Sequence, residues 1–447
     1  MIPYEGLYVV YFVSAIFFIL AIRGLSSPKT AREGNYLGML GMSIAVLSTL
    51  LILPSKNDFG ILIALVFAAV LGIVWANRVK LTALPQMIAL LNAFGGGASI
   101  LVGVAQIFRK NVYETDVLLG IMIGSLALSG SMIAFLKLDG RLNIKFLPAR
   151  HMFVFMSALF LAFCFANLVL IGSKTGFYLF LFSSLLCGML ITLPIGGADM
   201  PIVISFLNAC AGFAASGIGF SLYNVALIMT GAIVGISGLI LALVMTKAMN
   251  RSLRDVFLKD MQDKEETNQA KTGVVHVGSP QDAAFLMENA SKVIIVPGYG
   301  MAVADAGNAL KNLASVLELK YHVDVKFAIH PVAGRMPGHM NVLLAEAKVD
   351  YEKMFSLEDI NADFETADVA YVIGANDIVN PIAKTDLSSP LYGMPILEAQ
   401  KAKTVFMVKR SLASGYSGAQ NPLFYADNTL MLFGDAKKVT EEIVAAL

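Results

Sequence analysis

The chain has 447 residues, of which 57% are hydrophobic and 15% are charged. Soluble proteins carry about 25% charged residues, so this composition excludes an ordinary water-soluble protein. The formal net charge of +1 hides an asymmetry: residues 1–250 contain 14 Lys/Arg and 7 Asp/Glu, and residues 251–447 contain 19 and 25. The first half is therefore suited to lipid and the second to water.

The first half contains repeated apolar runs of membrane-spanning length. A transmembrane helix needs roughly 20 apolar residues, and glycines such as Gly96 and Gly231 let such helices approach closely. We therefore expect a multi-span α-helical membrane bundle of about nine helices over residues 1–250. The expected spans are 5–23, 36–54, 60–77, 84–108, 116–136, 152–172, 176–194, 199–220 and 224–247.

The loops between these spans predict the orientation, because Lys and Arg are retained on the cytoplasmic side of a membrane. With the N-terminus outside, twelve Lys and Arg residues lie on inner loops and four on outer loops. The sequence therefore predicts an integral membrane protein with its N-terminus outside and its second half in the cytoplasm.

Polar residues inside the expected spans need an explanation, since a central Asp costs about 2.5–3.5 kcal/mol on insertion scales. Asn92, Ser131 and Asn208 are compatible with interhelical hydrogen bonds that serve packing. Asp199 is compatible with an acidic cap at a helix start. A functional role in a proton path is the alternative for all four.

A charged linker is expected over 251–271, and residues 272–447 then alternate β-type runs with helical stretches. This alternation predicts a cytoplasmic α/β Rossmann-like domain with a parallel sheet. The expected strands are 292–296, 323–329, 369–373, 404–408 and 429–433.

The first expected strand leads directly into Gly298-Tyr299-Gly300 and a helical stretch to about Leu317. Glycines at such a turn allow the backbone to approach a pyrophosphate, which then lies at the helix N-terminus. A tight turn without any ligand is the alternative.

The ends of two further strands indicate which nucleotide would bind. The second strand ends in Ile329-His330-Pro331, without the acid that an NAD site places there for the ribose hydroxyls. Lys409-Arg410-Ser411 follow the fourth strand, and two cations with a hydroxyl suit a phosphate monoester. The pattern favours NADP over NAD, with a solvated strand end as the alternative reading of the two cations.

Two more segments lie where the same crevice is expected. Asn376 and Asp377 follow the third strand, where they either face the crevice or cap the next helix. Tyr416 lies between Gly415 and Gly418, in a loop that either folds over a nucleotide or is a surface turn. No metal-ligand spacing is present in the sequence, so no metal site is expected.

Together these segments resemble the beta subunit of proton-translocating NAD(P) transhydrogenase over nearly the whole chain. The motifs that carry the resemblance are 298–304, 330–338, 374–377, 393–395, 409–411 and, in the membrane half, 196–201 with Asn208. The resemblance implies that a set of residues binds NADP(H): Gly298, Tyr299, Gly300, Met301, Ala302, Val303, Val332, Ala333, Gly334, Arg335, Met336, Asn376, Asp377, Lys409, Arg410, Ser411, Tyr416, Asp435 and Ala436.

The resemblance also implies an activity: hydride passes directly between NAD(H) and NADP(H) while protons cross the membrane, with no catalytic side chain from this chain. The NAD(H) site would belong to an alpha subunit, and the complex would be a dimer of alpha/beta units in the inner cell membrane, without nucleic acid. A channel or transporter with a nucleotide-sensing Rossmann-like domain is the alternative function.

One departure from the family concerns the proton path or its coupling, for which the polar residues Asn92, Ser131, Asp199 and Asn208 are the candidates. Some members carry a histidine in the fourth span, where this sequence has Asn92. Because asparagine does not take up a proton at physiological pH, Asp199 or a partner-subunit residue becomes the candidate carrier. The linker then transmits its protonation to the nucleotide domain.

Overall fold

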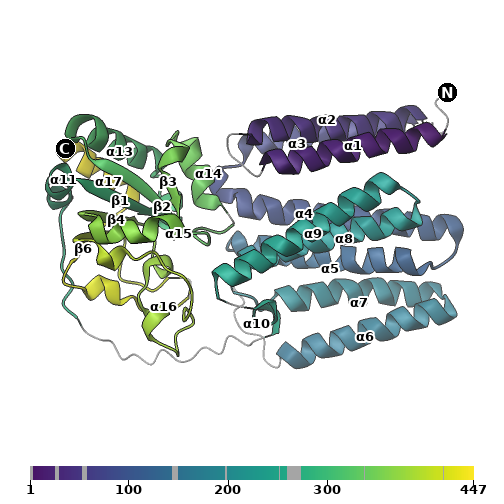
Figure 1. The fold of residues 1–447 in the computed structure, drawn as a ribbon. Coiled ribbons are helices and arrows are strands. Elements are labelled where there is room, and N and C mark those ends of the chain that lie inside the picture. Colours follow the sequence, from purple (N-terminus) through teal and green to yellow (C-terminus); the bar gives the residue numbers. More distant parts are fainter. Residues whose placement is uncertain are drawn as a thin grey trace. The chain divides into compact units, whose positions relative to one another are not determined.

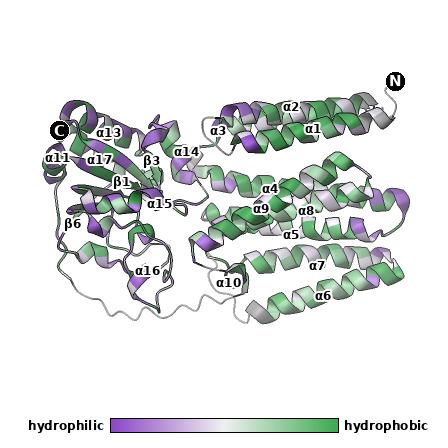
Figure 2. Cartoon of the chain, viewed as in Figure 1, coloured by the Kyte–Doolittle hydropathy of each residue, from purple (hydrophilic) through white to green (hydrophobic). Residues whose placement is uncertain are grey.

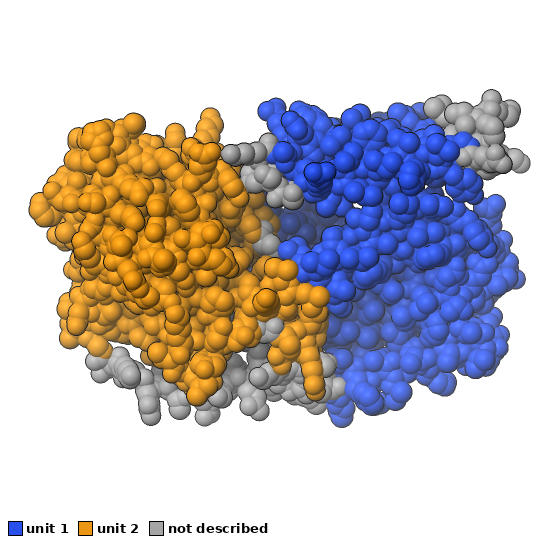
Figure 3. All heavy atoms as spheres, viewed as in Figure 1, with its two compact units in different colours: residues 1–195, 203–242 blue, residues 196–202, 243–447 orange. Residues whose placement is uncertain are grey.

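The computed structural model describes residues 4–25, 30–52, 58–142, 150–196, 199–250, 252–258, 273–336, 338–415 and 417–447. The chain divides into two compact units, one of residues 1–195 and 203–242 and the other of residues 196–202 and 243–447 (Figure 3). Each unit is considered by itself below.

Long helices make up the first half of the chain (Figure 1). Within the described residues, eight helices are long and apolar enough to cross a membrane. The 22-residue helix α2, at the expected span 36–54, is not among these eight. The long helices are α1 Tyr4–Leu25, α2 Ala31–Ile52, α3 Asp58–Arg78, α4 Leu84–Lys110, α5 Thr115–Leu138, α6 Arg150–Ile171, α7 Lys174–Thr192, α8 Met200–Ser221 and α9 Val225–Ala248, with a short 3-10 turn at Leu81–Ala83.

Glycines bring neighbouring helices of this bundle close together. A methyl group at Gly96 of α4 would lie 2.5 Å from the carbonyl oxygen of Gly124 on α5. A methyl group at Gly231 of α9 would lie 2.5 Å from the amide nitrogen of Ser216 on α8. The expected close approach at these glycines is thus present, as is usual for helices that associate in lipid.

Hydrophobic residues predominate along these long helices (Figure 2). On α3, Phe59, Phe67 and Ile73 are all exposed. Such a surface is typical of helices that face lipid rather than water. The expected multi-span membrane bundle is confirmed, and the chain is an integral membrane protein.

The second half contains a sheet of six parallel strands in the order β3-β2-β1-β4-β5-β6. Strands β1 and β4 lie at its centre and are almost completely buried, which is usual for a parallel sheet covered on both faces. All five expected strands are present, and the short edge strand β3 was not foreseen. The strands are β1 Lys292–Pro297, β2 Asp324–Ile329, β3 Met354–Ser356, β4 Val369–Ile373, β5 Thr404–Lys409 and β6 Thr429–Phe433.

Helices and short 3-10 segments connect these strands. Helices α11, α13 and α17 pack against one another. In the core, the hydroxyl groups of Tyr371 on β4 and Thr440 on α17 form a hydrogen bond of 2.9 Å. The α-helices are α10 Leu253–Leu258, α11 Pro280–Glu288, α12 Tyr299–Val303, α13 Gly307–Tyr321, α14 His339–Glu346, α15 Leu357–Ile360, α16 Ile382–Thr385 and α17 Ala436–Ala446. The 3-10 segments are η3 Tyr351–Lys353, η4 Asn361–Thr366, η5 Asp377–Val379, η6 Ala399–Lys401 and η7 Pro422–Tyr425.

The helical stretch expected from the glycine turn to Leu317 is not continuous. It is divided into α12 and α13, and Asp305 between them has a left-handed backbone with φ of 53°. The physical reason is local: α12 ends after one turn, and the amide of Ala306 folds back to the carbonyl of Met301 at 3.1 Å.

The strand order places one feature where ligands bind in sheets of this kind. Successive connections run outward in opposite directions from β1 and β4, so these two neighbours form the switch point of the sheet. In open α/β sheets, ligands bind beyond the carboxyl ends of the strands at this point.

Candidate functional site

The glycine turn after β1 lies against the end of β4. The amide of Gly298 donates to the carbonyl of Ile373, and that of Gly300 to the carbonyl of Gly374, both at 2.9 Å. Gly374 has φ of 65°, and a side chain there would overlap the backbone of Met301. Glycine is therefore required at this contact, and the two chain segments form the floor of a crevice.

The structure divides the residues expected in this turn into two groups. Gly298, Tyr299, Gly300 and Val303 line the crevice, whereas Met301 and Ala302 are buried beneath it. The last two therefore support the turn from the core side.

The segment after β2 forms a second wall. Val332, Ala333 and Gly334 line the crevice, and the guanidinium of Arg335 lies 4.4 Å from the centre of the Tyr299 ring. Met336 is buried. This cation–π contact joins the wall to the glycine turn.

His339, which was not expected from the sequence, supports the second wall. Its Nδ1 accepts the amide hydrogen of Arg335 at 3.1 Å, and its Nε2 has no hydrogen-bond partner among the described residues. Burial, and secondarily the charge of Arg335, lowers the pKa of His339. The ring is thus held in its neutral form.

His330 joins the second wall to a third, apolar wall, which is formed by Pro390, Leu391 and Met394. Its Nδ1 accepts from the amide of Val332 at 3.2 Å, and its Nε2 donates to the carbonyl of Pro395 at 2.7 Å. Burial lowers the pKa of His330 to about 4, against weaker opposition from the Pro395 carbonyl and Glu358.

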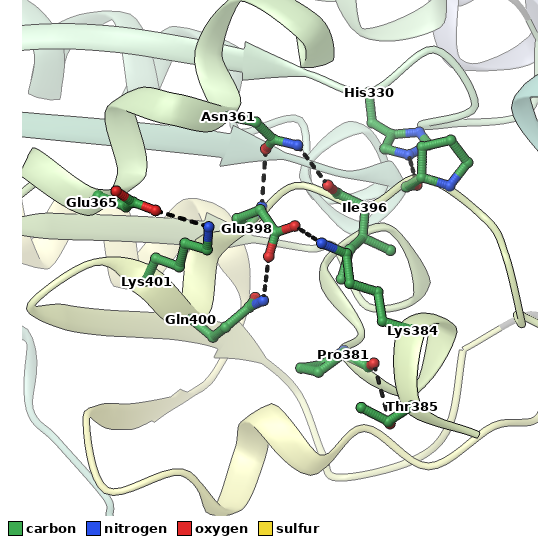
Figure 4. Close-up of polar contacts among 11 residues, drawn as sticks. His330, Asn361, Glu365, Pro381, Lys384, Thr385, Ile396, Glu398, Gln400 and Lys401 are labelled. Atoms are coloured by element: carbon green, nitrogen blue, oxygen red, sulfur yellow. Dashed lines mark hydrogen bonds and ion pairs between the residues drawn. The ribbon is translucent and has the colours of Figure 1, made fainter.

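A polar network behind the third wall holds it in place (Figure 4). The side chain of Asn361 donates to the carbonyl of Ile396 at 2.9 Å and accepts from the amide of Glu398 at 3.0 Å. The buried carboxylate of Glu398 pairs with Lys384 and accepts from Gln400 at 2.6 Å. Because a buried charge needs such partners, this network fixes the backbone that carries Leu391 and Met394 into the crevice.

Asn376 and Asp377 line the crevice at the end of β4. Asp377 begins the 3-10 segment η5 but does not cap it, because the carboxylate accepts instead from the amide and hydroxyl of Ser417. The helix-capping alternative for Asp377 is therefore wrong. Tyr416, the aromatic residue expected nearby, lies outside the described residues.

Two cations extend from the end of β5, as expected, but their surroundings differ. The Nζ of Lys409 lies 4.5 Å from the centre of the Phe424 ring and donates to the carbonyl of Ala413 at 2.6 Å. Burial lowers the pKa of Lys409 to about 8, although the charge of Asp377 opposes this effect. Lys409 is thus a half-buried ammonium, not a fully solvated strand end.

Arg410 is exposed and forms an ion pair with Asp435 at 2.8 Å, while Ser411 lies beside it on the edge of the crevice. Asp435 also accepts the amide hydrogen of Lys437 at 3.1 Å, which caps α17, and Ala436 lines the crevice. The bond from Arg410 is the main cause of the lowered pKa of Asp435.

In the membrane half, Asn92 of α4 donates to the carbonyl of Ile204 on α8 at 3.2 Å. Ser131 is fully buried, and its hydroxyl has no hydrogen-bond partner within the described part of the chain. Asn208 is half-buried on α8, and Asp199, which directly precedes α8, is buried. Asn92 therefore forms the interhelical bond expected for packing, whereas Ser131 does not.

The second half of the chain thus brings the glycine turn, the cations and the carboxylates to one edge of the sheet. Fold and crevice together define a dinucleotide-binding type of α/β domain, carried by a chain that also spans a membrane.

Comparisons with known proteins identify the family. Residues 7–446 match the model of the NAD(P) transhydrogenase beta subunit family. NAD(P) transhydrogenase subunit beta of Rhodospirillum rubrum is 49% identical to this chain over 456 residues, and the match covers 98% of each chain. The protein of the same name from the Rhodospirillum rubrum strain ATCC 11170 has the same identity and coverage. The chain belongs to the NAD(P) transhydrogenase beta subunit family and is therefore part of an oxidoreductase.

Proposed function

We propose that residues 272–447 bind NADP(H) in the crevice and that the chain couples hydride transfer between NAD(H) and NADP(H) to proton movement through residues 1–250. One observation carries the NADP(H) assignment. The glycine turn at Gly298 and the cations Lys409 and Arg410, far apart in sequence, line the same crevice at the switch point of the sheet.

The residues present fit a dinucleotide with an additional phosphate. Because Gly298 and Gly300 have no side chains, the turn packs directly on Gly374 and Ala375. The same two glycines line the crevice at the position where the pyrophosphate lies in dinucleotide-binding folds. A 2′-phosphate beside Lys409 would add a negative charge next to this half-buried ammonium and would raise its pKa again. The bound nicotinamide supplies the hydride chemistry, and this chain's residues orient it.

The end of β2 supports NADP(H) over NAD(H). Where an NAD site has an acid for the ribose diol, this chain has His330, whose two ring nitrogens are already bonded to Val332 and Pro395. It therefore has no free acceptor for a diol.

For proton coupling we assign Asp199 as the carrier, with Asn92, Ser131 and Asn208 along the path. Asn92 has no titratable proton and its amide is bonded to α8, whereas Asp199 is a buried carboxylate. Residues 251–271 would transmit the change to the nucleotide domain. An alpha subunit would carry NAD(H), in a dimer of alpha/beta units, with the N-terminus outside and residues 272–447 in the cytoplasm. Family membership argues against the channel or transporter alternative.

The NADP(H) assignment is tested by changing Lys409 and Arg410 together to Ala in the full chain. We expect NADP⁺ binding to weaken by about 2–4 kcal/mol, or roughly 30- to 1000-fold, and NAD⁺ binding to change little. Titration calorimetry measures both.

The matched control is the double change of Lys401 and Lys403 to Ala at the opposite end of β5, where both lysines form exposed ion pairs. This variant should bind NADP⁺ as the unaltered chain does. Equal losses for NAD⁺ and NADP⁺ in the Lys409/Arg410 variant would contradict the assignment.

The proton assignment is tested with Asp199→Asn in membranes that also contain the alpha subunit. We expect the variant to lose proton-coupled transhydrogenation while NADP⁺ still binds. Unchanged coupling, measured with a pH-sensitive dye during turnover, would refute the role of Asp199.

A further inference from the structure

Two loops that follow neighbouring strands lie side by side at the crevice. Strands β4 and β5 are paired up to Ile373 and Val408, so the segments that follow them leave the sheet together. We call residues 410–415 and 417–421 the β5 loop. Its residues 410, 411, 413–415 and 417 line the crevice.

One residue of the β5 loop bonds both oxygens of the Asp377 carboxylate. The Ser417 amide donates to Oδ2 at 3.0 Å, and the Ser417 hydroxyl donates to Oδ1 at 2.9 Å. The amide of Ala419 donates to the same hydroxyl oxygen at 3.1 Å. The hydroxyl hydrogen is therefore directed at Asp377.

Other contacts make this junction close. A methyl group at Gly415 would lie 2.5 Å from Oδ1 of Asp377, so the loop backbone rests on the carboxylate. Farther along, the side-chain amide of Asn421 donates to the carbonyl and side-chain oxygens of Asn376, both at 3.1 Å. Ser417 thus fastens the part of the loop that lines the crevice, and Asn421 fastens its far end.

We infer that Ser417 is a positioning residue for the nucleotide site: it fixes the β5 loop to Asp377 and thereby slows the release of NADP(H). Hydrogen bonds to an ionised carboxylate are stronger than neutral ones. Loss of the hydroxyl removes its bond to Oδ1 of Asp377 and so loosens the wall of the crevice that carries Arg410 and Ser411. This inference rests on the proposed NADP(H) site and adds to it the residue that governs retention.

The test compares Ser417→Thr with Ser417→Val in the full chain purified with its alpha subunit. Threonine and valine have nearly the same shape, and only threonine keeps the hydroxyl. Stopped-flow fluorescence of NADPH gives the association and release rates. We expect the valine variant to release NADPH about tenfold faster with unchanged association, and the threonine variant to resemble the unaltered chain.

Two further variants exclude a general structural effect. Ser388 also donates its hydroxyl to an aspartate, Asp386, at 2.6 Å, but this exposed pair does not line the crevice. Ser388→Ala should leave both rates unchanged. In an Asp377→Asn background, Ser417→Val should add little to the release rate, because the charged acceptor is already absent.

The outcomes separate this inference from the function on which it rests. If the unaltered chain retains NADPH and Ser417→Val releases it at the same rate, or if the valine effect persists fully beside Asp377→Asn, the role of Ser417 is refuted. If the unaltered chain does not bind NADPH, both proposals fail. Ser417→Ala replaces the valine variant if the latter does not fold.

Discussion

The imidazole of His330 donates to the carbonyl of Pro395 at 2.7 Å and so joins the end of β2 to a loop that is remote in sequence. Its other nitrogen accepts from Val332 at 3.2 Å. The bond from Val332 needs the neutral ring, because a protonated Nδ1 cannot accept. The geometry of two crevice walls therefore depends on one uncharged histidine.

We predict that acid destabilises the nucleotide domain through this residue. Because the pKa of His330 is about 4 when folded and about 6.5 when unfolded, the unfolded chain binds more protons between these values. The free energy of unfolding should therefore decrease by about 3 kcal/mol as the pH falls from 6.5 towards 4. Hydrogen exchange of the β1 and β4 amides measures this loss. His330→Ala should remove the part of this pH-dependent loss that is due to His330. Changing His276, which is exposed, to Ala should not alter the loss.

We predict that NADP⁺ affinity depends on pH through Lys409. Its pKa of about 8 means that it loses its charge as the pH rises above 8, while a bound phosphate would favour the charged form. Affinity should therefore fall by up to about tenfold per unit above pH 8. Calorimetry between pH 7 and 10 measures it. Lys409→Arg should flatten the profile, since arginine remains charged; an unchanged slope would contradict the prediction.

We predict that Gly374→Ala disrupts the crevice floor. The substitution combines a strained backbone at φ of 65° with overlap of the Met301 backbone. It should lower the free energy of unfolding of the domain by about 2–4 kcal/mol and should also weaken NADP⁺ binding. Gly338 is the control, because it has φ of 70° but open space around it. Gly338→Ala should cost only about 1 kcal/mol. Denaturant titration followed by hydrogen exchange distinguishes the two, and equal effects would refute the role of close packing.

We predict that Gly96→Ala destabilises the membrane unit and its neighbour Gly97→Ala does not. At Gly96 the added methyl meets the Gly124 carbonyl oxygen at 2.5 Å, and at Gly97 it meets only the end of the Leu128 side chain at 3.8 Å. The first change should cost about 1–3 kcal/mol. Thermal aggregation of the purified protein in detergent provides the measurement. A similar loss in both variants would mean that contact with α5 is not the cause.

The fold was largely predictable because it depends on patterns that are local in sequence. Apolar runs of span length indicated the membrane helices, and β-type runs indicated five of the six strands. Strand β3 has three residues, too few for a pattern to be distinguished from a loop. The break at Asp305 was not foreseen either, because it depends on a backbone conformation that glycine or asparagine would have indicated more clearly.

The site was predictable at strand ends and not beyond them. Lys409 follows an apolar strand, so its place at the crevice could be expected; its half-buried position over Phe424 could not, because that contact arises only when two distant segments fold together. The same holds for Ser417 beside Asp377. The bond between His339 and the Arg335 amide is local, but it depends on an irregular turn. None of these contacts leaves a periodic signal in the sequence.

The all-parallel strand order also affects how the domain forms during synthesis. Strand β1 emerges early but lies between β2 and β4, and Asp435 follows β6, the last strand to be made. Parallel neighbours form contacts distant in sequence, which fold slowly. At about 5–20 residues per second, β4, β5 and β6 are synthesised several seconds after β1 and β2. The crevice is therefore completed only after nearly the whole domain has left the ribosome, when the helices that precede it have already been made.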